Sequence, residues 1–492
     1  MSPAARTGSA RTRAAGTADA SAAFFDLDRT LLAGASGEVF SRAMRSAGLV
    51  TRSIPGEKYL YRLFDLVGET LPSMALARQA ASLAAGHPRA AVLAAAAAAP
   101  AAAAAMVQPF AGQQLDEHRA VGRPIVLATT TPYDLVRPFA DRLGLDDVVA
   151  TRYGVAADGT YDGRLVGPFV WSAGKLAAVE EWADRHGVDL SSSYAYSDSV
   201  YDTPLLAAVG NPHVVNPDPR MMLMAAARRW PVLHLDVSRG VAKVPVVGLE
   251  VQRLALQFSR PAFCPYARFH IDGVDRVPDS GPVILCANHR SYFDVAAISM
   301  MLAKTGRTVR FLGKKEVFDA PLVGQLAAAM GGIRVDRGTG SDEPLQAAAD
   351  ALAGGEMVAI MPQGTIPRGP AFFEPTLVGR WGAARLAQLS GAPVIPVGLW
   401  GTEKVWPRSA RFPNVLNVSD PPEVQIRVGL DVELKHRSLD ADTKRIMAAI
   451  GDLLPEEAHR RREPTPEELA RTYPPGYAGD PDREPDRRPG TD

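Results

Sequence analysis

A short apolar run that ends at a histidine constrains the fold of this chain more than any other feature. Residues 282–287 have the length and composition of a buried strand, and Asn288 and His289 follow them directly. Asp294 comes next, in the opening turn of a helix expected over residues 292–303. A strand that delivers an imidazole to the start of a helix indicates an α/β domain with a polar site at the end of the strand.

The spacing of this histidine and aspartate predicts a general-base pair. If Asp294 accepts the hydrogen of one ring nitrogen of His289, it fixes one tautomer, and the other nitrogen can take a proton from an alcohol. The pair needs no serine nucleophile, so it suits attack of an acceptor hydroxyl on an activated acyl group. The alternative is that His289 only ends a strand and Asp294 only favours the helix N-terminus.

Three further blocks follow this pattern in order. They are a block with two arginines at residues 332–337, a Pro-Gln-Gly-Thr block within residues 361–368 and a Val-Ile-Pro-Val block within residues 394–398. In order and spacing, the four blocks resemble those of the glycerolipid acyltransferase family, which includes the lysophosphatidate and glycerol-3-phosphate acyltransferases. The resemblance covers about residues 263–454, and the Asn-His-x-x-x-x-Asp block is its most specific part.

The resemblance implies a role for each residue of this pattern. His289 would be the base and Asp294 its orienting partner, with acyl-CoA or acyl carrier protein as the donor and a lysolipid as the acceptor. The remaining residues implied in substrate binding are Arg337, for the phosphate of the acceptor, Gly364, Thr365 and Arg368.

The chain departs from the family pattern at two positions of the third block. Gln363 stands where the family has glutamate, and Ile366 stands where it has arginine. Arg368 or Arg380 could reach the same anion, because a guanidinium offers forked donors for phosphate. The departures also allow an acceptor other than lysophosphatidate.

The first half of the chain carries a second set of strand ends. Phe24 and Phe25 end an apolar strand that leads into Asp26 and Asp28. Three later segments also place polar side chains at predicted strand ends or helix starts: Thr129 after the strand 125–128, Lys175 before the helix 176–185, and Asp198 and Asp202 after the strand 194–197. Carboxylates, a hydroxyl and a lysine gathered in this way describe a Mg²⁺-assisted phosphoryl-transfer site, because Mg²⁺ prefers oxygen ligands.

These four motifs in register resemble the haloacid dehalogenase superfamily, in its phosphoserine-phosphatase-like branch (subfamily IB), over about residues 22–235. The resemblance implies that Asp26 becomes aspartyl-phosphate and that Asp28 protonates the leaving group and later activates water. Thr129 and Lys175 would hold the phosphoryl oxygens. The implied Mg²⁺ ligands are Asp26, the main-chain oxygen of Asp28, and Asp198, with Asp202 in support.

Two departures from this branch concern the substrate. Tyr201 precedes the last aspartate, where the branch usually has asparagine. The glutamate that recognises the amino group of phosphoserine is expected near Ala35, and Glu38 is close but not equivalent. The pattern therefore predicts phosphatase chemistry on a phosphate monoester without assigning phosphoserine as the substrate.

Composition and charge exclude several other classes of protein. The 492-residue chain has 54 basic and 54 acidic side chains, so it has no global attraction for nucleic acid. Cys264 and Cys286 are too few for a disulfide framework or a zinc cluster, and they fit a reducing compartment. Length alone favours roughly two to four domains.

The expected domains, in order, are a disordered tail (1–20), a phosphatase domain (21–235) with a helical cap (about 33–120), a linker with an amphipathic helix (236–262), an acyltransferase domain (263–454) and a disordered tail (455–492). Residues 90–107 are almost wholly apolar, but Pro100 interrupts them and alanine inserts poorly into bilayers. They also lie between Asp26 and Thr129, which must meet at one site. We therefore expect this run in the cap rather than across a membrane.

Contact with a membrane surface is expected, because long-chain acceptors reside there. Within residues 244–259, four apolar side chains recur on one face at helical spacing, namely Val247, Val251, Leu254 and Phe258. This helix would either lie in the membrane interface or pack against the acyltransferase domain, and the sequence leaves both alternatives open.

The sequence thus predicts an α/β fold throughout, with a doubly wound parallel sheet in the N-terminal half and an α/β acyltransferase domain in the C-terminal half. The arrangement resembles fused phosphatase–acyltransferase proteins of actinobacteria. It implies a bifunctional enzyme of phospholipid synthesis that uses Mg²⁺ and acyl-CoA. The enzyme would be cytoplasmic and peripherally associated with the inner face of the plasma membrane.

Three alternatives stay open. The phosphatase domain could be a regulatory or scaffolding module, which Tyr201 would suit. The C-terminal domain could bind lipid without transferring an acyl group, which Gln363 and Ile366 would suit. The chain could also acylate an acceptor and then remove its phosphate in two successive steps.

Overall fold

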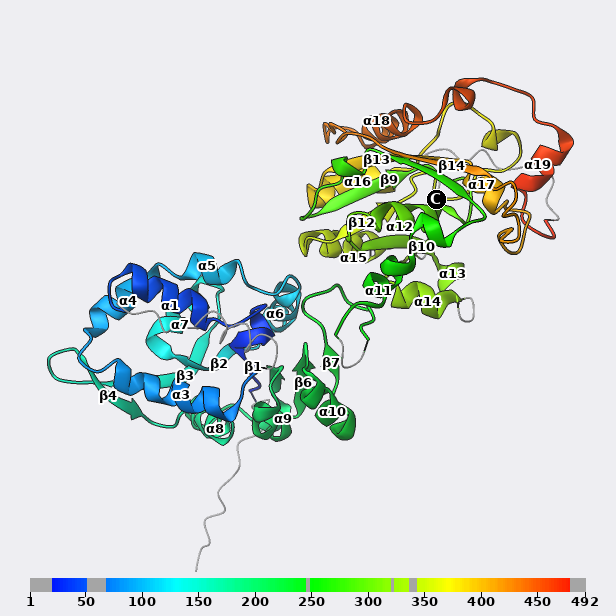
Figure 1. Ribbon diagram of the computed structural model, residues 1–492. Helices are drawn as coiled ribbons and strands as arrows, with labels where there is room; N and C mark the ends of the chain where they lie inside the picture. The colour runs from blue at the N-terminus through cyan, green and yellow to red at the C-terminus, as the bar shows by residue number, and fades with distance from the viewer. Residues whose placement is uncertain (1–19, 51–67, 245–247, 320–322, 336–342, 478–492) are drawn as a thin grey trace, which may run out of the picture. The chain divides into compact units, whose positions relative to one another are not determined.

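The structure is a computed structural model of the chain. It describes residues 20–50, 68–244, 248–319, 323–335 and 343–477. The chain divides into two compact units, unit 1 (Met1–Asp236) and unit 2 (Val237–Asp492), both drawn in Figure 1. Arg337 and Val247, two residues singled out from the sequence, lie outside the described residues.

Unit 1 is built on a seven-stranded sheet in the order β4-β3-β2-β1-β5-β6-β7. Neighbouring strands are parallel except β3 and β4. The strands are β1 (Ala23–Phe25), β2 (Ile125–Pro132), β3 (Asp147–Val155), β4 (Tyr161–Val166), β5 (Tyr194–Ser197), β6 (Asn211–Val215) and β7 (Val232–Leu233). Strand order reverses between β1 and β5, which is where open α/β sheets place their ligand sites.

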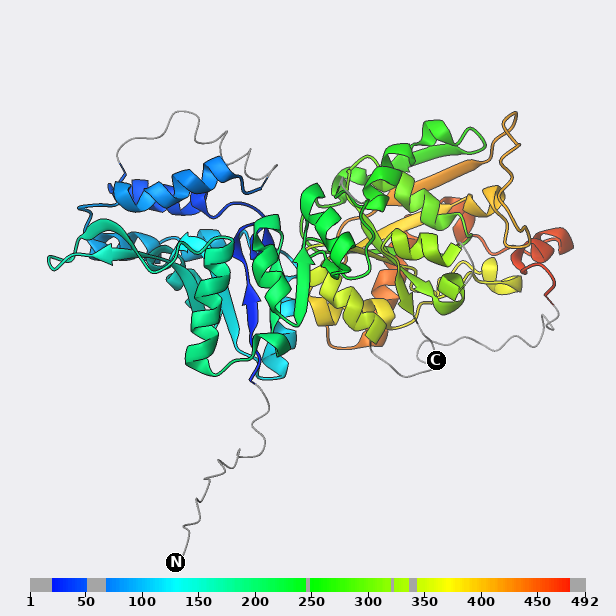
Figure 2. The same ribbon diagram turned by 90° about the horizontal axis from the view of Figure 1, so that it is seen from below.

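Helices cover both faces of this sheet (Figure 2). Successive side chains of β1 point to opposite faces, so Phe25 stacks on Tyr196 with ring centroids 4.2 Å apart, while Phe24 meets Trp182 edge-on at 5.5 Å. The flanking helices are α6 (Ala111–Ala120) and α7 (Tyr133–Arg142), with α8 (Ala173–His186), α9 (Thr203–Ala208) and α10 (Pro219–Arg228) in the other core. The predicted doubly wound sheet is confirmed.

Four α-helices lie in the described part of the segment between β1 and α6. They are α1 (Gly37–Ser46), α3 (Leu71–Leu83), α4 (Arg89–Ala97) and α5 (Pro100–Ala104). The apolar run at residues 90–107 falls mainly in α4 and α5, which bury Val92 and Ala103 within unit 1. In the described part of the chain, no helix has both the length and the apolar character needed to cross a bilayer.

Unit 2 contains a second seven-stranded sheet, in the order β11-β10-β12-β9-β13-β14-β8. Only the β13–β14 pair is antiparallel among its described strands. The strands are β8 (Arg268–Asp272), β9 (Val283–Ala287), β10 (Val309–Lys314), β11 (Ile333–Val335), β12 (Met357–Ile360), β13 (Val394–Trp400) and β14 (Glu423–Val428). Every residue of β9 is buried, so this strand fixes its carboxyl end firmly in the core.

The helices of unit 2 pack around this sheet. They are α11 (Val251–Phe258), α12 (Asp294–Leu302), α13 (Lys315–Asp319), α14 (Val323–Ala329), α15 (Glu343–Ala353), α16 (Gly382–Ser390), α17 (Thr402–Val405), α18 (Leu439–Gly451) and α19 (Pro466–Thr472). Together with unit 1, they make the whole described fold α/β, as predicted.

The amphipathic helix predicted over residues 244–259 is α11, and it buries a face other than the predicted apolar stripe. Gln252 is buried and bonds to the main chain of Val309, donating from Nε2 at 2.8 Å and accepting at Oε1 at 3.1 Å. Leu256 lies on the buried face, whereas Phe258 is 70% exposed. The helix therefore packs against its own unit. The amide of Gln252 forms hydrogen bonds with the main chain of β10, at a position where the sequence predicts an apolar contact.

Structure also continues past residue 455, where the sequence predicts a disordered tail. Thr465 and Glu468 form a capping box that starts α19. Thr472 at the end of this helix is buried, and its hydroxyl accepts a hydrogen bond from the main-chain nitrogen of Gly369 at 2.8 Å. The expectation of disorder is thus wrong for residues 455–477, because helix caps and one buried contact hold a segment that has few apolar residues.

Candidate active sites

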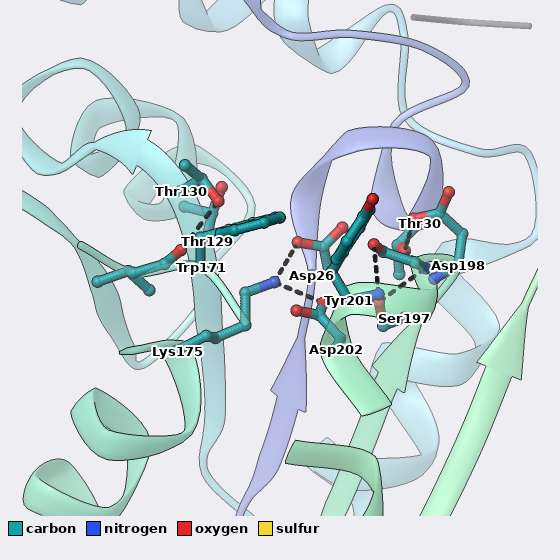
Figure 3. A network of polar contacts seen from close by, with 12 residues as sticks. Asp26, Thr30, Thr129, Thr130, Trp171, Lys175, Ser197, Asp198, Tyr201 and Asp202 are labelled. Atoms are coloured by element: carbon teal, nitrogen blue, oxygen red, sulfur yellow. Dashed lines mark hydrogen bonds and ion pairs between the residues drawn. The ribbon is translucent and has the colours of Figure 1, made fainter. Parts of the chain in front are cut away.

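The carboxyl ends of β1, β2 and β5 meet at one edge of the sheet in unit 1. Phe25, the last residue of β1, is in register with residues of both β2 and β5. Asp26 and Asp198 directly follow β1 and β5, and Thr129 lies in the second half of β2. Figure 3 shows these side chains around one polar network. The structure therefore brings together residues that are more than a hundred positions apart in the sequence.

Lys175 joins two carboxylates of this site from the first turn of α8. Its Nζ donates to Oδ1 of Asp26 at 2.7 Å and to Oδ2 of Asp202 at 2.6 Å, as Figure 3 shows. Ser197 also donates to Oδ2 of Asp202, at 2.7 Å. Because Lys175 is only 1% exposed, its positive charge is directed at these two carboxylates rather than at solvent.

Burial sets the proton affinity of the carboxylates. Loss of water raises the pKa of Asp26 to about 7, although Lys175 acts to lower it. The same desolvation raises the pKa of Asp198 well above its usual value and also raises that of Glu69. For Lys175, burial acts to lower the pKa, but the charges of Asp202 and Asp26 outweigh it and raise the pKa. Desolvation therefore disfavours the ionised form of these carboxyl groups despite the nearby cationic side chains.

The residues of this site fit a divalent cation. Oδ1 of Asp202 is buried without a hydrogen-bond partner. The crowded carboxylates described above have raised pKa values, which a nearby cation would reverse. Among the described residues, no three His, Cys, Asp or Glu side chains form a metal-holding group. A cation here would use few side chains and a main-chain oxygen, which suits Mg²⁺ because it retains several waters.

The turn after β1 shapes the position of Asp28. Residues Leu27–Leu31 form an irregular helical turn in which Arg29 takes a left-handed φ of 61°. Oδ1 of Asp28 accepts from the main-chain nitrogen of Ser36 at 2.5 Å. Nε of Arg29 lies 3.3 Å from Oδ2 of Asp198. The turn thus places Arg29 beside the carboxylate that follows β5 and fixes Asp28 through the main chain of Ser36.

Two threonines of the sequence motifs, Thr30 and Thr129, bring hydroxyl groups to this site. Both residues are buried. Thr30 donates to Oδ1 of Asp198 at 3.3 Å and accepts from the main-chain nitrogen of the same residue at 3.0 Å. Oγ1 of Thr129 accepts from the main-chain nitrogen of Thr131 at 3.2 Å. The acceptor role of Thr129 leaves its hydroxyl hydrogen to donate to an anionic oxygen.

Glu69 is a carboxylate of this site that the sequence analysis does not identify. It lies just before α3, and its Oε2 accepts from Nε1 of Trp171 at 3.0 Å and from Oγ of Ser199 at 2.7 Å. The rings of Trp171 and Tyr201 have centroids 4.8 Å apart, and both stand beside Asp26 in Figure 3. One carboxylate and two aromatic rings therefore border the position of Asp26.

No sequence motif marks Glu69, because it comes from a long connection between strands rather than from a strand end. Glu38, the acid nearest to the expected position of a substrate-recognising glutamate, instead forms an exposed i,i+4 ion pair with Arg42. In the sequence, Trp171 and Ser199 stand out only because they lie near Lys175 and Asp198 in the chain. The signal that would have found Glu69 is spatial, not sequential.

In unit 2, His289 and Asp294 meet at the carboxyl end of β9. Nδ1 of His289 lies 2.8 Å from Oδ2 of Asp294, which is fully buried. The same oxygen accepts from the main-chain nitrogens of Arg290 at 2.7 Å and Ser291 at 2.9 Å. Oδ1 accepts from the hydroxyl of Thr402 at 2.6 Å. Because the carboxylate oxygen accepts, the ring hydrogen sits on Nδ1, and Nε2 of His289 is left as a proton acceptor.

Two amide side chains fix the strand end that carries His289. Asn288 donates to the carbonyl of Leu399 at 2.8 Å and accepts from its nitrogen at 2.7 Å, which ties β9 to β13. Oε1 of Gln363 accepts from the main-chain nitrogen of His289 at 2.7 Å. A neutral amide therefore makes this hydrogen bond at a position where the family pattern has a carboxylate.

Arg290 anchors the loop between His289 and α12. Its Nε and Nη2 each lie 3.0 Å from an oxygen of Glu403. The guanidinium also lies over the ring of Phe372 at 4.3 Å and over that of Trp400 at 4.1 Å. Burial acts to raise the pKa of Glu403, but Arg290 outweighs it, so the pKa is lowered. A forked ion pair between two aromatic rings restricts the motion of the histidine loop.

The third acyltransferase block, residues 361–368, lies beside His289 because Gln363 binds the main chain of that residue. The other residues of the block have separate environments. Gly364 takes a φ of 73°, which closes a turn whose main-chain bond to Met361 is 2.8 Å long. Thr365 is buried. The guanidinium of Arg368 lies 4.9 Å from the ring centroid of Tyr477. The structure thus places the turn next to the base, and Arg368 against the C-terminal segment.

The two folds and their sites define a hydrolase domain joined to an acyltransferase domain. The family model of haloacid dehalogenase-like hydrolases matches residues 23–207, and the Acyltransferase family model matches residues 268–400. The chain belongs to the haloacid dehalogenase-like hydrolase family and carries an acyltransferase domain fused to it.

Individual proteins are similar to parts of this chain. Over 217 residues, the chain is 36% identical to the inhibition of morphological differentiation protein of Streptomyces azureus, covering 43% of this chain and 77% of that protein. It is 33% identical over 229 residues to phosphoserine phosphatase SerB1 of Mycobacterium tuberculosis, covering 46% and 74%. The structure of the 1-acyl-sn-glycerophosphate acyltransferase PlsC from Thermotoga maritima aligns with 41% of this chain and 77% of that chain, at 20% identity and a TM-score of 0.31. The acyltransferase assignment itself rests on the family model.

Proposed function

We propose that unit 2 transfers an acyl chain from acyl-CoA or acyl carrier protein to the hydroxyl of 1-acylglycerol-3-phosphate or a related lysolipid. The observation that carries this proposal is the buried carboxylate of Asp294, whose oxygens are held by His289, Thr402 and two main-chain nitrogens. This arrangement fixes the imidazole in the tautomer that a general base requires.

The reaction would proceed by direct transfer. Nε2 of His289 takes the proton from the acceptor hydroxyl while that oxygen attacks the thioester carbonyl. The tetrahedral adduct then collapses, the carbon–sulfur bond breaks, and the imidazolium returns the proton to the departing thiolate. Asp294 stabilises the positive ring at the intermediate stage through Nδ1, so no covalent acyl-enzyme is needed.

We propose further that unit 1 hydrolyses a phosphate monoester through aspartyl-phosphate. An oxygen of Asp26 attacks phosphorus, and Asp28 protonates the alcohol that leaves. Asp28 then takes a proton from water, which attacks the phosphoryl group and frees inorganic phosphate. Thr129 and Lys175 bind the phosphoryl oxygens during both steps.

Asp26, Asp198 and the main-chain oxygen of Asp28 would hold Mg²⁺, with Asp202 in support through Lys175 and Ser197. Bound there, Mg²⁺ offsets negative charge on the carboxylates and on the phosphoryl oxygens. The orphaned oxygen of Asp202 and the raised pKa values of Asp26 and Asp198 support binding of a cation at this site.

With both activities, the chain would be a bifunctional enzyme of phospholipid synthesis that is cytoplasmic and peripherally bound to the inner face of the plasma membrane. The test uses the full chain with labelled acyl-CoA, a panel of lysolipids and a panel of phosphate esters. Label should enter lysolipid with the wild type and not with His289→Ala. Phosphate release equal to that of Asp26→Asn would reduce unit 1 to a regulatory or scaffolding module, and absence of acyl transfer would reduce unit 2 to a lipid-binding domain.

A further inference from the structure

A loop in unit 2 exposes an unusual concentration of large apolar side chains. It runs between α17 and β14, and its residues 411–418 are here named the apolar loop. Within it, Phe412 is 72% exposed and Leu416 is 87% exposed, with Val415 at 47% and Val418 at 57%. In Figure 2 the chain between α17 and β14 extends away from the body of its unit. Single exposed apolar residues are ordinary, but such a cluster on a projecting loop marks a surface that binds something apolar.

The base of this loop is joined directly to the histidine site. The ring of Trp406 meets that of Tyr292 edge-on, with centroids 5.6 Å apart, and the hydroxyl of Ser291 donates to the carbonyl of Trp406 at 2.6 Å. Tyr292 and Val295, from the segment that begins α12, are themselves 45% and 43% exposed. Exposed apolar side chains therefore occur both on the loop and beside His289, and Trp406 connects the base of the loop to the histidine segment.

We propose that the apolar loop inserts into the surface of a lipid bilayer and holds the histidine site against it. Two exposed cations, Lys404 and Arg411, precede the apolar residues in the chain and one exposed acid, Asp420, follows them, so net positive charge beside an apolar tip suits an anionic bilayer. The inference rests on the proposed acyl transfer, because lysolipids and acyl chains are amphiphiles that partition into bilayers. A loop inserted beside the base would let an acceptor reach it without leaving the membrane.

A second apolar surface competes for the same role. Phe258 at the end of α11 and Phe263 are 70% and 60% exposed, with ring centroids 6.4 Å apart. The apolar loop differs from them in that Trp406, at its base, contacts the segment 289–294. Substitutions in the apolar loop are expected to weaken binding to vesicles, whereas substitutions in this second surface are not.

The test measures binding of the full chain to phosphatidylcholine vesicles with and without phosphatidylglycerol, by flotation. Leu416→Ser and Phe412→Ser should each weaken binding about tenfold or more, since each removes an apolar side chain from the inserted tip. The matched control is Leu430→Ser. Leu430 is 73% exposed, but β14 separates it from the loop, so its variant should bind as the wild type does. Binding should also be tighter with phosphatidylglycerol.

Three results would overturn the proposal: unchanged vesicle binding in Leu416→Ser and Phe412→Ser, loss of binding in Phe258→Ser alone, or loop variants that alter only self-association of the chain. If the proposed acyl transfer itself is wrong, the assays give a different result. In that case the wild type acylates no lysolipid, yet it still binds vesicles through the loop. Acylation of a water-soluble short-chain acceptor should persist in Leu416→Ser, which separates loss of docking from loss of chemistry or folding.

Discussion

The two candidate sites balance charge in opposite ways. In unit 1, burial raises the pKa values of Asp26, Asp198 and Glu69, and Lys175 offsets only part of their charge. In unit 2, Asp294 is fully buried, but donors from His289, two main-chain nitrogens and one hydroxyl surround its oxygens. The first site leaves one carboxylate oxygen of Asp202 without a hydrogen-bond partner, whereas both oxygens of Asp294 in the second site accept hydrogen bonds from the chain.

This difference explains how each site can act. Under the proposed function, a carboxylate surrounded by donors is a fixed part of the scaffold that orients the imidazole of His289. Under the proposed function, the carboxylates crowded around Lys175 and Arg29 would reach their working charge balance only with Mg²⁺ and a phosphate ester bound. The comparison predicts that the two sites respond separately to mutation, to pH and to loss of metal.

The largest expected effect is that of Asp26→Asn on phosphate release. The amide cannot attack phosphorus, so release should fall by more than about 10⁴-fold. Phosphate release by the full chain, assayed with Mg²⁺, is the measurement, and acyl transfer by the same variant should be unchanged. Glu38→Gln, a neutralised acid on an exposed helix face, is the matched control. Full phosphate release by Asp26→Asn would contradict the assignment of the nucleophile.

The reciprocal change is made at the histidine site. His289→Ala and Asp294→Asn should lower acyl transfer by about 10²- to 10⁴-fold, because the first removes the base and the second disturbs its tautomer. Phosphate release should stay at the wild-type rate. The exposed His270, replaced by alanine, serves as the control for loss of an imidazole elsewhere in unit 2. Equal losses in both activities would show that the sites are not independent.

A smaller effect is expected on the stability of unit 1 at acid pH. Burial lowers the pKa of His118 to about 4, with a further lowering by Arg123. Between pH 6.5 and 4 the unfolded chain therefore binds a proton that the folded state does not. Stability should fall as pH drops through this window, by up to about 3 kcal/mol, and this contribution is fully lost below the folded pKa. Urea unfolding at several pH values measures the slope.

The control for this prediction is His118→Gln, which keeps a donor for the hydroxyl of Tyr196 but does not titrate in this range. Its unfolding free energy should depend less on pH between 6.5 and 4 than that of the wild type. An identical slope in the two proteins would mean that His118 is not the group responsible.

The smallest effect concerns Thr402, whose hydroxyl donates to Oδ1 of Asp294. Thr402→Val leaves one buried oxygen unpaired, so kcat for acyl transfer should fall about tenfold with little change in KM. Thr402→Ser keeps the hydroxyl and should retain most of the rate. A rise in KM with unchanged kcat would indicate that Thr402 acts on substrate binding instead of on the orientation of the base.

Local patterns in the sequence predicted the strand ends and the pairs that lie close in the chain. His289 and Asp294 are linked by one strand–helix turn, so their contact follows from periodicity alone. Gln363 and Thr402 have no such signal, because they reach the same site from other strands of the sheet. Glu69 was missed for the same reason, since it enters unit 1's site from the connection between β1 and β2.

Other differences arise from polar groups that take structural roles. The apolar stripe of α11 pointed to the wrong buried face, because the amide of Gln252 pairs with the main chain of β10 and takes the interior position. The sequence predicts disorder for the charged C-terminal segment. The capping box at Thr465 and one hydrogen bond to Thr472 instead hold this segment in place through residue 477. Hydrophobic patterning does not register hydrogen bonds of this kind.

Chelation tests the contrast between the two sites most directly. Both activities of the wild-type chain would be followed in one sample as EDTA is added and Mg²⁺ is then restored. We predict that phosphate release stops with EDTA and returns with Mg²⁺, while acyl transfer to lysolipid continues throughout at the same rate. Acyl transfer that stops with the chelator, or phosphate release that survives it, would contradict the account of one site completed by a cation and one completed by the chain.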